Sequence, residues 1–96
     1  MVTHHRIYTI NGGKMESWIR MFNEVVLPLN VKFGAQVIGA WVNHCQNEFI
    51  WIRSFPTEDQ LKTYETSAER TAQLPEAGLH IAKIEVRTIE DALASI

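Results

Sequence analysis

The chain has 96 residues, of which 46% are hydrophobic and 21% charged, and its net charge is -2 at pH 7. This length forms one domain, residues 1–96, and the composition excludes a disordered or fibrous chain. The charge balance provides no basic surface, so we expect neither nucleic acid nor a membrane as a partner. No apolar run is long enough to span a bilayer, and the first residues lack an apolar secretory segment, so a cytoplasmic location is expected.

The N-terminal part of the chain is predicted to form a strand followed by a long helix. Residues 3–10 are typical of a strand, and Asn11-Gly12-Gly13 provides the turn that ends it. The helix is predicted from Lys14 to about Gly34, with a bend at Pro28, which lacks a backbone N–H. Its apolar positions recur at spacings of three and four residues: Met15, Trp18, Ile19, Phe22, Val25, Val26 and Leu29.

Residues 36–55 are predicted to form a hairpin around the polar residues His44-Cys45-Gln46. Both faces of this hairpin are apolar, because residues at alternate positions of a strand share a face. One predicted face carries Ile38, Ala40, Val42, Ile50 and Ile52. The other carries Val37, Gly39, Trp41, Phe49, Trp51, Arg53 and Phe55.

A second helix and a last strand are predicted in the C-terminal half. Thr57 provides a helix cap with Gln60 at the capping-box position, and Leu61, Tyr64 and Ala68 mark the buried side. The helix is expected to fade through residues 67–71, and residues 74–78 are predicted as a turn or a short helical piece. Residues 80–89 alternate as a strand, with Ala82, Ile84 and Val86 on one face and Lys83, Glu85 and Arg87 on the other.

The element order β-α-β-β-α-β predicts an α+β, ferredoxin-like fold, in which a four-stranded antiparallel sheet carries both helices on one face. The first helix is expected to cover the face of Ile50 and Ile52, which leaves the face of Trp41 and Trp51 bare. Exposing this aromatic face would forgo on the order of 10 kcal/mol of hydrophobic stabilisation. A second copy of the sheet would cover it, so a homodimer is expected.

Short motifs along most of the chain together resemble the NIPSNAP family. They are residues 6–14, Val26-Leu27-Pro28-Leu29, residues 34–42 ending in Gly39-Ala40-Trp41-Val42, residues 47–55, and Glu85-Val86-Arg87. The resemblance implies a dimeric α/β barrel, the architecture shared with small antibiotic-biosynthesis monooxygenases and muconolactone isomerases. Residues 66–78 depart from the family pattern, because they lack the longer aromatic-rich segment of other members.

The candidate site is the chamber between the two sheets of the dimer. Its predicted lining is His5, Ile7, Thr9, Trp41, Trp51, Arg53, Glu85 and Arg87, which suits a small apolar or aromatic ligand. This set depends on the first strand turning Ile10, Tyr8, Arg6 and His4 toward the helices. In the alternative interpretation, the charged residues pair across a packed dimer core that has no cavity.

The sequence is compatible with two functions. In the first, the protein only binds its ligand, with Trp41, Trp51, Arg53 and Arg87 as the binding residues. In the second, it is a cofactor-free enzyme, either a monooxygenase or an isomerase or cyclase, with His5, Tyr8 and Glu85 as candidate proton-transfer residues for an aromatic or polyketide-like compound. The four histidines show no ligand spacing, so no metal is expected, and Cys45 is expected to be an ordinary exposed thiol.

Overall fold

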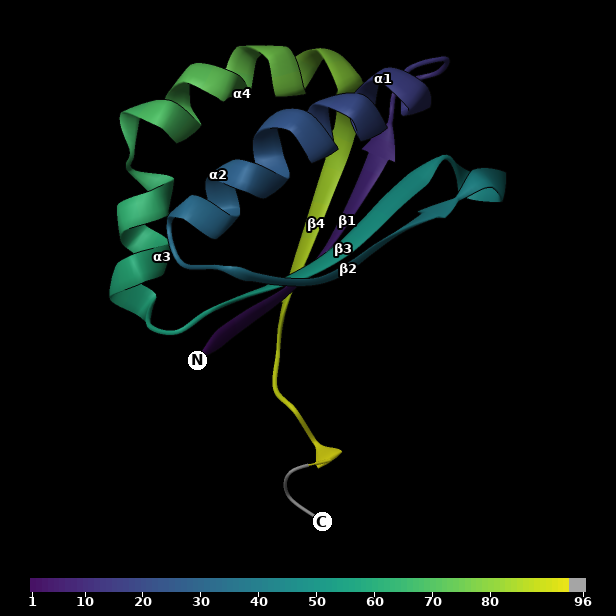
Figure 1. Cartoon of the computed structure of the whole chain (residues 1–96). Coiled ribbons are helices and arrows are strands. Elements are labelled where there is room, and N and C mark those ends of the chain that lie inside the picture. Colours follow the sequence, from purple (N-terminus) through teal and green to yellow (C-terminus); the bar gives the residue numbers. More distant parts are fainter. Residues whose placement is uncertain (94–96) are drawn as a thin grey trace.

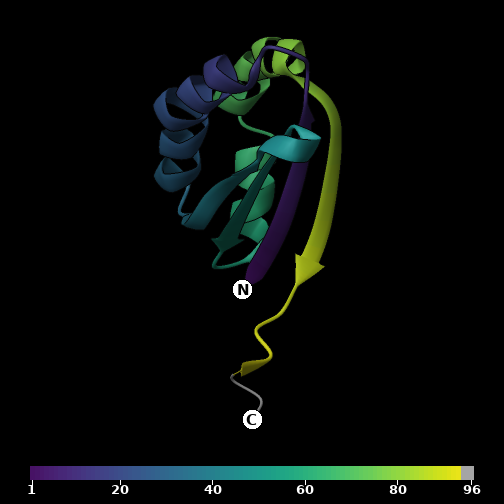
Figure 2. The ribbon, with the colours of Figure 1, turned by 90° about the vertical axis from the view of Figure 1, so that its right-hand side faces the viewer.

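A computed structural model describes residues 1–93 and has a single four-stranded antiparallel sheet with strand order β2-β3-β1-β4. The helices lie together on one face of this sheet (Figures 1 and 2). The ferredoxin-like α+β prediction is therefore confirmed. The strands are β1 (Val2–Ile10), β2 (Gln36–Asn43), β3 (Glu48–Phe55) and β4 (Ile81–Ile89).

The first helix is continuous but changes its winding before Pro28. It runs through α1 (Met15–Met21), the π-helical turn η1 (Phe22–Val26) and α2 (Leu27–Lys32). Pro28 lies at the junction of η1 and α2, inside this continuous helix, where it cannot donate a backbone hydrogen bond. The helix ends at Lys32, and the chain turns away at Gly34, whose φ of +95° is favoured by glycine. Trp18, Phe22 and other apolar side chains of this helix are buried against the sheet, as predicted.

The register of the hairpin differs from the prediction and exchanges the two faces of β3. The strands pair Trp41 with Ile50 and Ala40 with Trp51, because the loop has four residues, His44–Asn47, and not three. Asn47 adopts the left-handed conformation that closes this loop. A change of one residue in register moves every side chain of a strand to the opposite face. Trp51 and Arg53 therefore face the helices and not the predicted chamber, and the same holds for Phe49 and Phe55.

The second half of the chain contains two helices where one was predicted. Helix α3 (Glu58–Glu65) begins at Thr57, whose hydroxyl oxygen accepts a hydrogen bond from the Gln60 N–H, as predicted. Helix α4 (Ala68–His80) replaces the predicted turn and begins at Ser67. Pro75 lies inside this helix at an exposed position and cannot donate a backbone hydrogen bond. Within residues 1–93, no helix has the length and hydrophobicity needed to cross a bilayer.

The sheet face opposite the helices is uncovered and largely apolar at its centre. The pairing places Trp41, Ile50, Ile7 and Glu85 in one row across the four strands. Trp41 is 51% exposed and Ile38 is 56% exposed on this open face. The structure thus confirms an uncovered apolar face, although its apolar residues are Ile7, Ile38, Trp41, Ile50 and Ile52.

Candidate functional site

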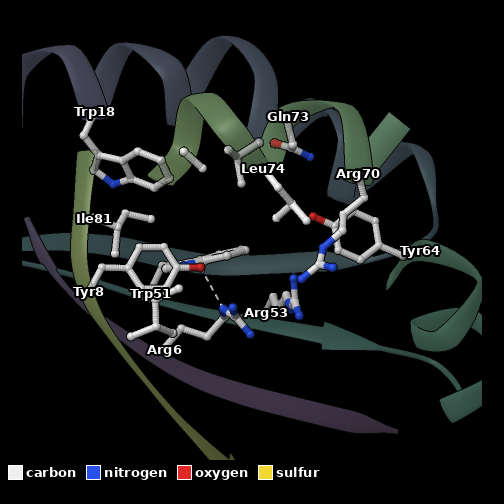
Figure 3. Close-up of a pocket in the computed structure, with 13 residues that line it drawn as sticks. Arg6, Tyr8, Trp18, Trp51, Arg53, Tyr64, Arg70, Gln73, Leu74 and Ile81 are labelled. Atoms are coloured by element: carbon white, nitrogen blue, oxygen red, sulfur yellow. Dashed lines mark hydrogen bonds between the residues drawn. The ribbon is translucent and has the colours of Figure 1, made fainter. Parts of the chain in front are cut away.

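A small pocket lies between the covered face of the sheet and helix α4 (Figure 3). Its volume of about 80 Å³ is well below the range of roughly 300–1,000 Å³ that is usual for drug-sized ligands. Strands β1, β3 and β4 and the helical segments α1, η1, α3 and α4 contribute to it. The lining residues are Arg6, Tyr8, Trp18, Val26, Trp51, Arg53, Tyr64, Arg70, Gln73, Leu74, Ala77, Ile81 and Ile84.

Arg53 of β3 is the most unusual residue of this pocket, because it is only 3% exposed and forms no salt bridge with any described residue. Its guanidinium carbon lies 5.4, 5.4 and 5.3 Å from the ring centroids of Trp51, Phe55 and Tyr64. Such contacts favour a cation at this position. Burial, and to a lesser extent the charge of Arg6, lowers the pKa of Arg53 to about 10. Arg53 therefore remains charged at neutral pH.

Asn30 of α2 holds one end of the Arg53 guanidinium. Its side chain is fully buried, and its Oδ1 accepts a hydrogen bond of 3.0 Å from Arg53 Nη1. Its Nδ2 donates to the Val26 carbonyl at 2.8 Å and to the Tyr64 hydroxyl at 3.2 Å. All the polar atoms of the Asn30 amide are thus engaged, and Arg53 is fixed by a rigid group. On the other side, Arg53 Nη2 lies 3.5 Å from His4 Nδ1.

Arg6 and Tyr8 of β1 form the second polar group of the pocket. Arg6 Nε donates a hydrogen bond of 2.8 Å to the Tyr8 hydroxyl (Figure 3). The Tyr8 ring is held edge-on against Trp18 and Trp51, at centroid distances of 5.6 and 6.4 Å. Because the hydroxyl oxygen already accepts from Arg6, its own proton is available to donate to a ligand.

Several buried N–H donors of the pocket have no acceptor among the described residues. They are Nε1 of Trp18, Nε1 of Trp51 and Nε of Arg53, and the Gln73 amide nitrogen is in the same position. Buried donors without acceptors are rare in folded proteins, and each costs about 1–3 kcal/mol. All these atoms belong to residues that line one pocket, and a ligand rich in acceptor atoms would satisfy those donors that it reaches.

The charged residues of the pocket also favour an anionic ligand. Arg6, Arg53 and Arg70 line it, whereas none of the described residues in the lining is acidic. The carboxylate of Glu65 exerts a weaker field on Arg53 from an exposed position on α3. Like charges held together in a partly dry site repel each other, so a bound anion relieves a repulsion that the fold maintains.

The predicted site residues divide between the two faces of the sheet. His5, Trp41, Glu85 and Arg87 lie on the open face, as predicted: His5 pairs with Arg87 in the register of β1 and β4. Tyr8 lies on the helix side, also as predicted. Trp51 and Arg53, which were placed with the first group, instead join Tyr8 in the pocket.

Glu85 is engaged by neighbours of its own strand on the open face. It forms salt bridges with Lys83 at 2.9 Å and Arg87 at 3.3 Å. The hydrogen bond from Lys83 is the main reason why the pKa of Glu85 lies below its usual value. These contacts leave Glu85 charged and exposed, which is unfavourable for a general base but compatible with pairing across an interface.

The prediction from sequence missed Arg6, Asn30, Tyr64 and the α4 residues Arg70 and Gln73 as parts of the site. The sequence contains a signal for Arg6 and Asn30. Arg6 lies on the strand parity that was assigned to the helices, and Asn30 lies one position after the apolar stripe of the first helix. A polar residue on a buried face is more informative than an apolar one. The α4 residues gave no such signal, because their helix was not predicted.

The described part of the chain contains no cluster of three or more His, Cys, Asp or Glu side chains with the geometry of a metal site. The pocket instead offers arginine, tyrosine and indole donors, which are ligands for an anion and not for a cation. Cys45 is exposed in the hairpin loop, away from the pocket lining.

His4 provides a pH-dependent contribution to stability that can be measured. Burial, followed by the charges of Arg53 and Arg6, lowers the pKa of His4 below its usual value, with Glu65 opposing weakly. The unfolded chain therefore binds more protons than the folded one just below pH 6.5, so stability falls as the pH falls through this window. Chemical denaturation of the wild type and of His4→Gln from pH 8 to 5 should show a smaller pH slope in the variant. Equal slopes would contradict the assignment.

Comparison with known proteins gives one family and a consistent fold. The NIPSNAP family model matches residues 3–89. An uncharacterized NIPSNAP domain protein from Burkholderia xenovorans has 16% sequence identity and a TM-score of 0.83, over 96% of this chain and 95% of that one. A NIPSNAP family protein from Agrobacterium tumefaciens has 20% identity and a TM-score of 0.80, over 95% and 92% of the two chains.

A further similar structure is described as an antibiotic biosynthesis monooxygenase. It has 14% identity and a TM-score of 0.77, over 96% of this chain and 99% of that one. This likeness concerns the fold alone. No curated protein was found to match the sequence.

Proposed function

The chain belongs to the NIPSNAP family, and we propose that it is a homodimeric protein that binds a small organic anion in the pocket between the sheet and helix α4. The unpaired buried donors of Trp18, Trp51 and Arg53 are the observation that carries this proposal. A water molecule brings donors as well as acceptors, whereas a carboxylate brings acceptors only. A carboxylate or an enolate-like oxygen therefore satisfies this set of donors better than water.

The lining also limits the apolar part of the ligand. Trp18, Trp51, Ile81 and Ile84 provide apolar walls around the guanidinium groups. The small volume of the pocket favours a compact group, such as a carboxylate on a short chain or on a single aromatic ring. The small apolar or aromatic ligand expected from sequence is thus retained in the proposal, but with a negative charge and on the helix side of the sheet.

The homodimer is proposed from the open face. Ile38 and Trp41 are more than half exposed, and Ile7, Ile50 and Ile52 continue the same apolar surface. Contiguous apolar surfaces of this kind mark protein interfaces. A two-fold axis through the face brings each surface against its own copy, and the charges at Glu85 and Arg87 can pair with those of the second copy. The pocket lies on the other side of the sheet, so both features can coexist.

Binding of the anion is tested by calorimetry with charged ligands and their neutral analogues. Benzoate and butyrate are expected to bind at least about tenfold more tightly than benzamide and butyramide, because hydrogen bonds to a charged acceptor contribute about 1.5–3 kcal/mol. The measurements are made at low ionic strength, since salt screens the contribution of Arg70, which is only half-buried. Equal affinities for the acids and amides, or no binding of either, would rule out the proposed site.

A cofactor-free enzyme is the second candidate, and the position of Tyr8 favours it. Among the three predicted proton-transfer residues, Tyr8 lines the pocket, whereas His5 and Glu85 lie on the open face. Arg53 and the Tyr8 hydroxyl together can stabilise an oxyanion that develops on a bound carbonyl or phenol. Oxygen uptake in the presence of an electron-rich phenol would support a monooxygenase, and solvent exchange of an enolisable proton would support an isomerase or cyclase. Either activity should be lost in Tyr8→Phe.

A further inference from the structure

A broader apolar groove lies beside the pocket, between helix α4 and strand β4. The groove has a volume of about 340 Å³ and is lined by Leu74, Ala77, Gly78, Ile81, Ala82, Lys83 and Ile84. Leu74, Ala77, Ile81 and Ile84 also line the pocket, so the two spaces share a wall. In Figure 3, the guanidinium groups of Arg6 and Arg53 lie on the sheet side of the pocket, and Leu74 lies on the α4 side.

Apolar side chains of β4 remain exposed because it is an edge strand that the helices do not fully cover. Ile84 and Val86 belong to the face that carries the helices, yet they are 50% and 45% exposed. Leu74 is 43% exposed on the opposite wall. Apolar side chains that line a groove and remain half exposed gain stabilisation when an apolar chain covers them.

We propose that the ligand is an amphipathic carboxylate, with its charged head at Arg53 and Arg6 and a linear apolar tail along the groove between α4 and β4. This inference rests on the proposed function and names the class of its ligand. The polarity of the two adjacent spaces supports it: residues with unpaired N–H donors line the pocket, whereas the shared wall and the groove are lined by Leu74, Ala77 and Ile84. No described residue of the groove is acidic, so a carboxylate meets no repulsion on entry.

Affinity should therefore depend on the length of the tail. In calorimetry with acetate, butyrate, hexanoate and octanoate below their micellar concentrations, affinity is expected to rise about two- to fourfold per methylene, because each buried CH₂ contributes about 0.8 kcal/mol and the groove covers it in part. If octanoate binds within twofold of butyrate, the tail site is wrong while the anion site stands. If no acid of any length binds, the proposed function itself fails.

A matched pair of variants locates the tail. Ile84→Thr places a hydroxyl in the groove and keeps a β-branched side chain on an edge strand, so it should lower the gain per methylene to less than half. Val31→Thr makes a comparable change at a 54% exposed position of α2 that lines neither space, and it should keep the wild-type gain. Equal gains in both variants would place the tail elsewhere and overturn the inference.

Discussion

Arg53→Met is expected to lower the affinity for a small carboxylate by at least about 30-fold while leaving the protein folded and no less stable. Removal of a buried charge from a binding site typically costs 2–5 kcal/mol of binding free energy. In the ligand-free protein, however, Arg53 is a buried cation without an acidic partner among residues 1–93. The lowered pKa, about 10 against an ordinary 12.5, corresponds to a cost on the order of 3 kcal/mol in stability.

The sign of this stability effect follows from the protonation states. Because the pKa of Arg53 is lower in the folded protein, the unfolded state favours the charged form, and the cost is fully present below about pH 10. Methionine removes this cost but leaves the Oδ1 of Asn30 without its donor, which offsets part of the gain by about 1–3 kcal/mol. Binding and urea denaturation of the same variant are therefore expected to respond differently.

Arg20→Met serves as the control, because Arg20 is exposed on α1 and does not line the pocket. It should change neither the affinity nor the free energy of unfolding appreciably. Unaltered carboxylate binding in Arg53→Met would show that the anion site lies elsewhere. A loss of folding in this variant would show that Arg53 is needed for the fold. It would contradict the claim that the buried charge of Arg53 lowers the stability of the ligand-free protein.

Trp41→Glu is expected to convert the proposed homodimer into a monomer. Trp41 is the largest side chain of the open face and is half exposed in the single chain, so its removal affects the interface more than the fold. Central tryptophans of interfaces commonly contribute 2 kcal/mol or more, and a buried carboxylate adds a further cost. Ultracentrifugation at micromolar concentration should give one chain of 11.0 kDa for the variant and twice that mass for the wild type.

Val31→Glu is the matched control for this measurement. Val31 is 54% exposed, close to the 51% of Trp41, but it lies on α2, away from the open face. This variant should remain dimeric. A wild-type protein that sediments as a single chain would exclude the proposed dimer, and dissociation of both variants would indicate a loss of folding, which circular dichroism detects.

The fold could be predicted because local signals and periodicity agree along most of the chain. The strand parity of β1 follows from Ile10 and Tyr8, and the cap of α3 follows from Thr57 and Gln60. The hairpin faces could not be assigned, because they depend on whether the loop has three or four residues. Asn47 decides this by adopting a left-handed conformation, and the sequence around it contains no glycine to mark the position.

The location of the site could not be predicted for the same reason. In the observed register of β3, Arg53 lies on the helix side of the sheet and not in the predicted chamber. There it lines the same pocket as Arg6 of β1. Helix α4, which covers the pocket, was not predicted because it contains Pro75 and Gly78, and both residue types usually indicate a turn. Tertiary packing of Leu74 and Ala77 over the sheet overrides that local preference.

The most direct test of the anion site is the response of the three tryptophan indole N–H signals in a ¹H–¹⁵N spectrum during titration with octanoate. Trp18 and Trp51 line the pocket, and their buried indole N–H groups have no acceptor among residues 1–93, whereas Trp41 lies on the open face. A bound carboxylate should shift the signals of Trp18 and Trp51 and leave that of Trp41 in place. A shift confined to Trp41, or no shift of any of the three, would contradict a site on the helix side of the sheet.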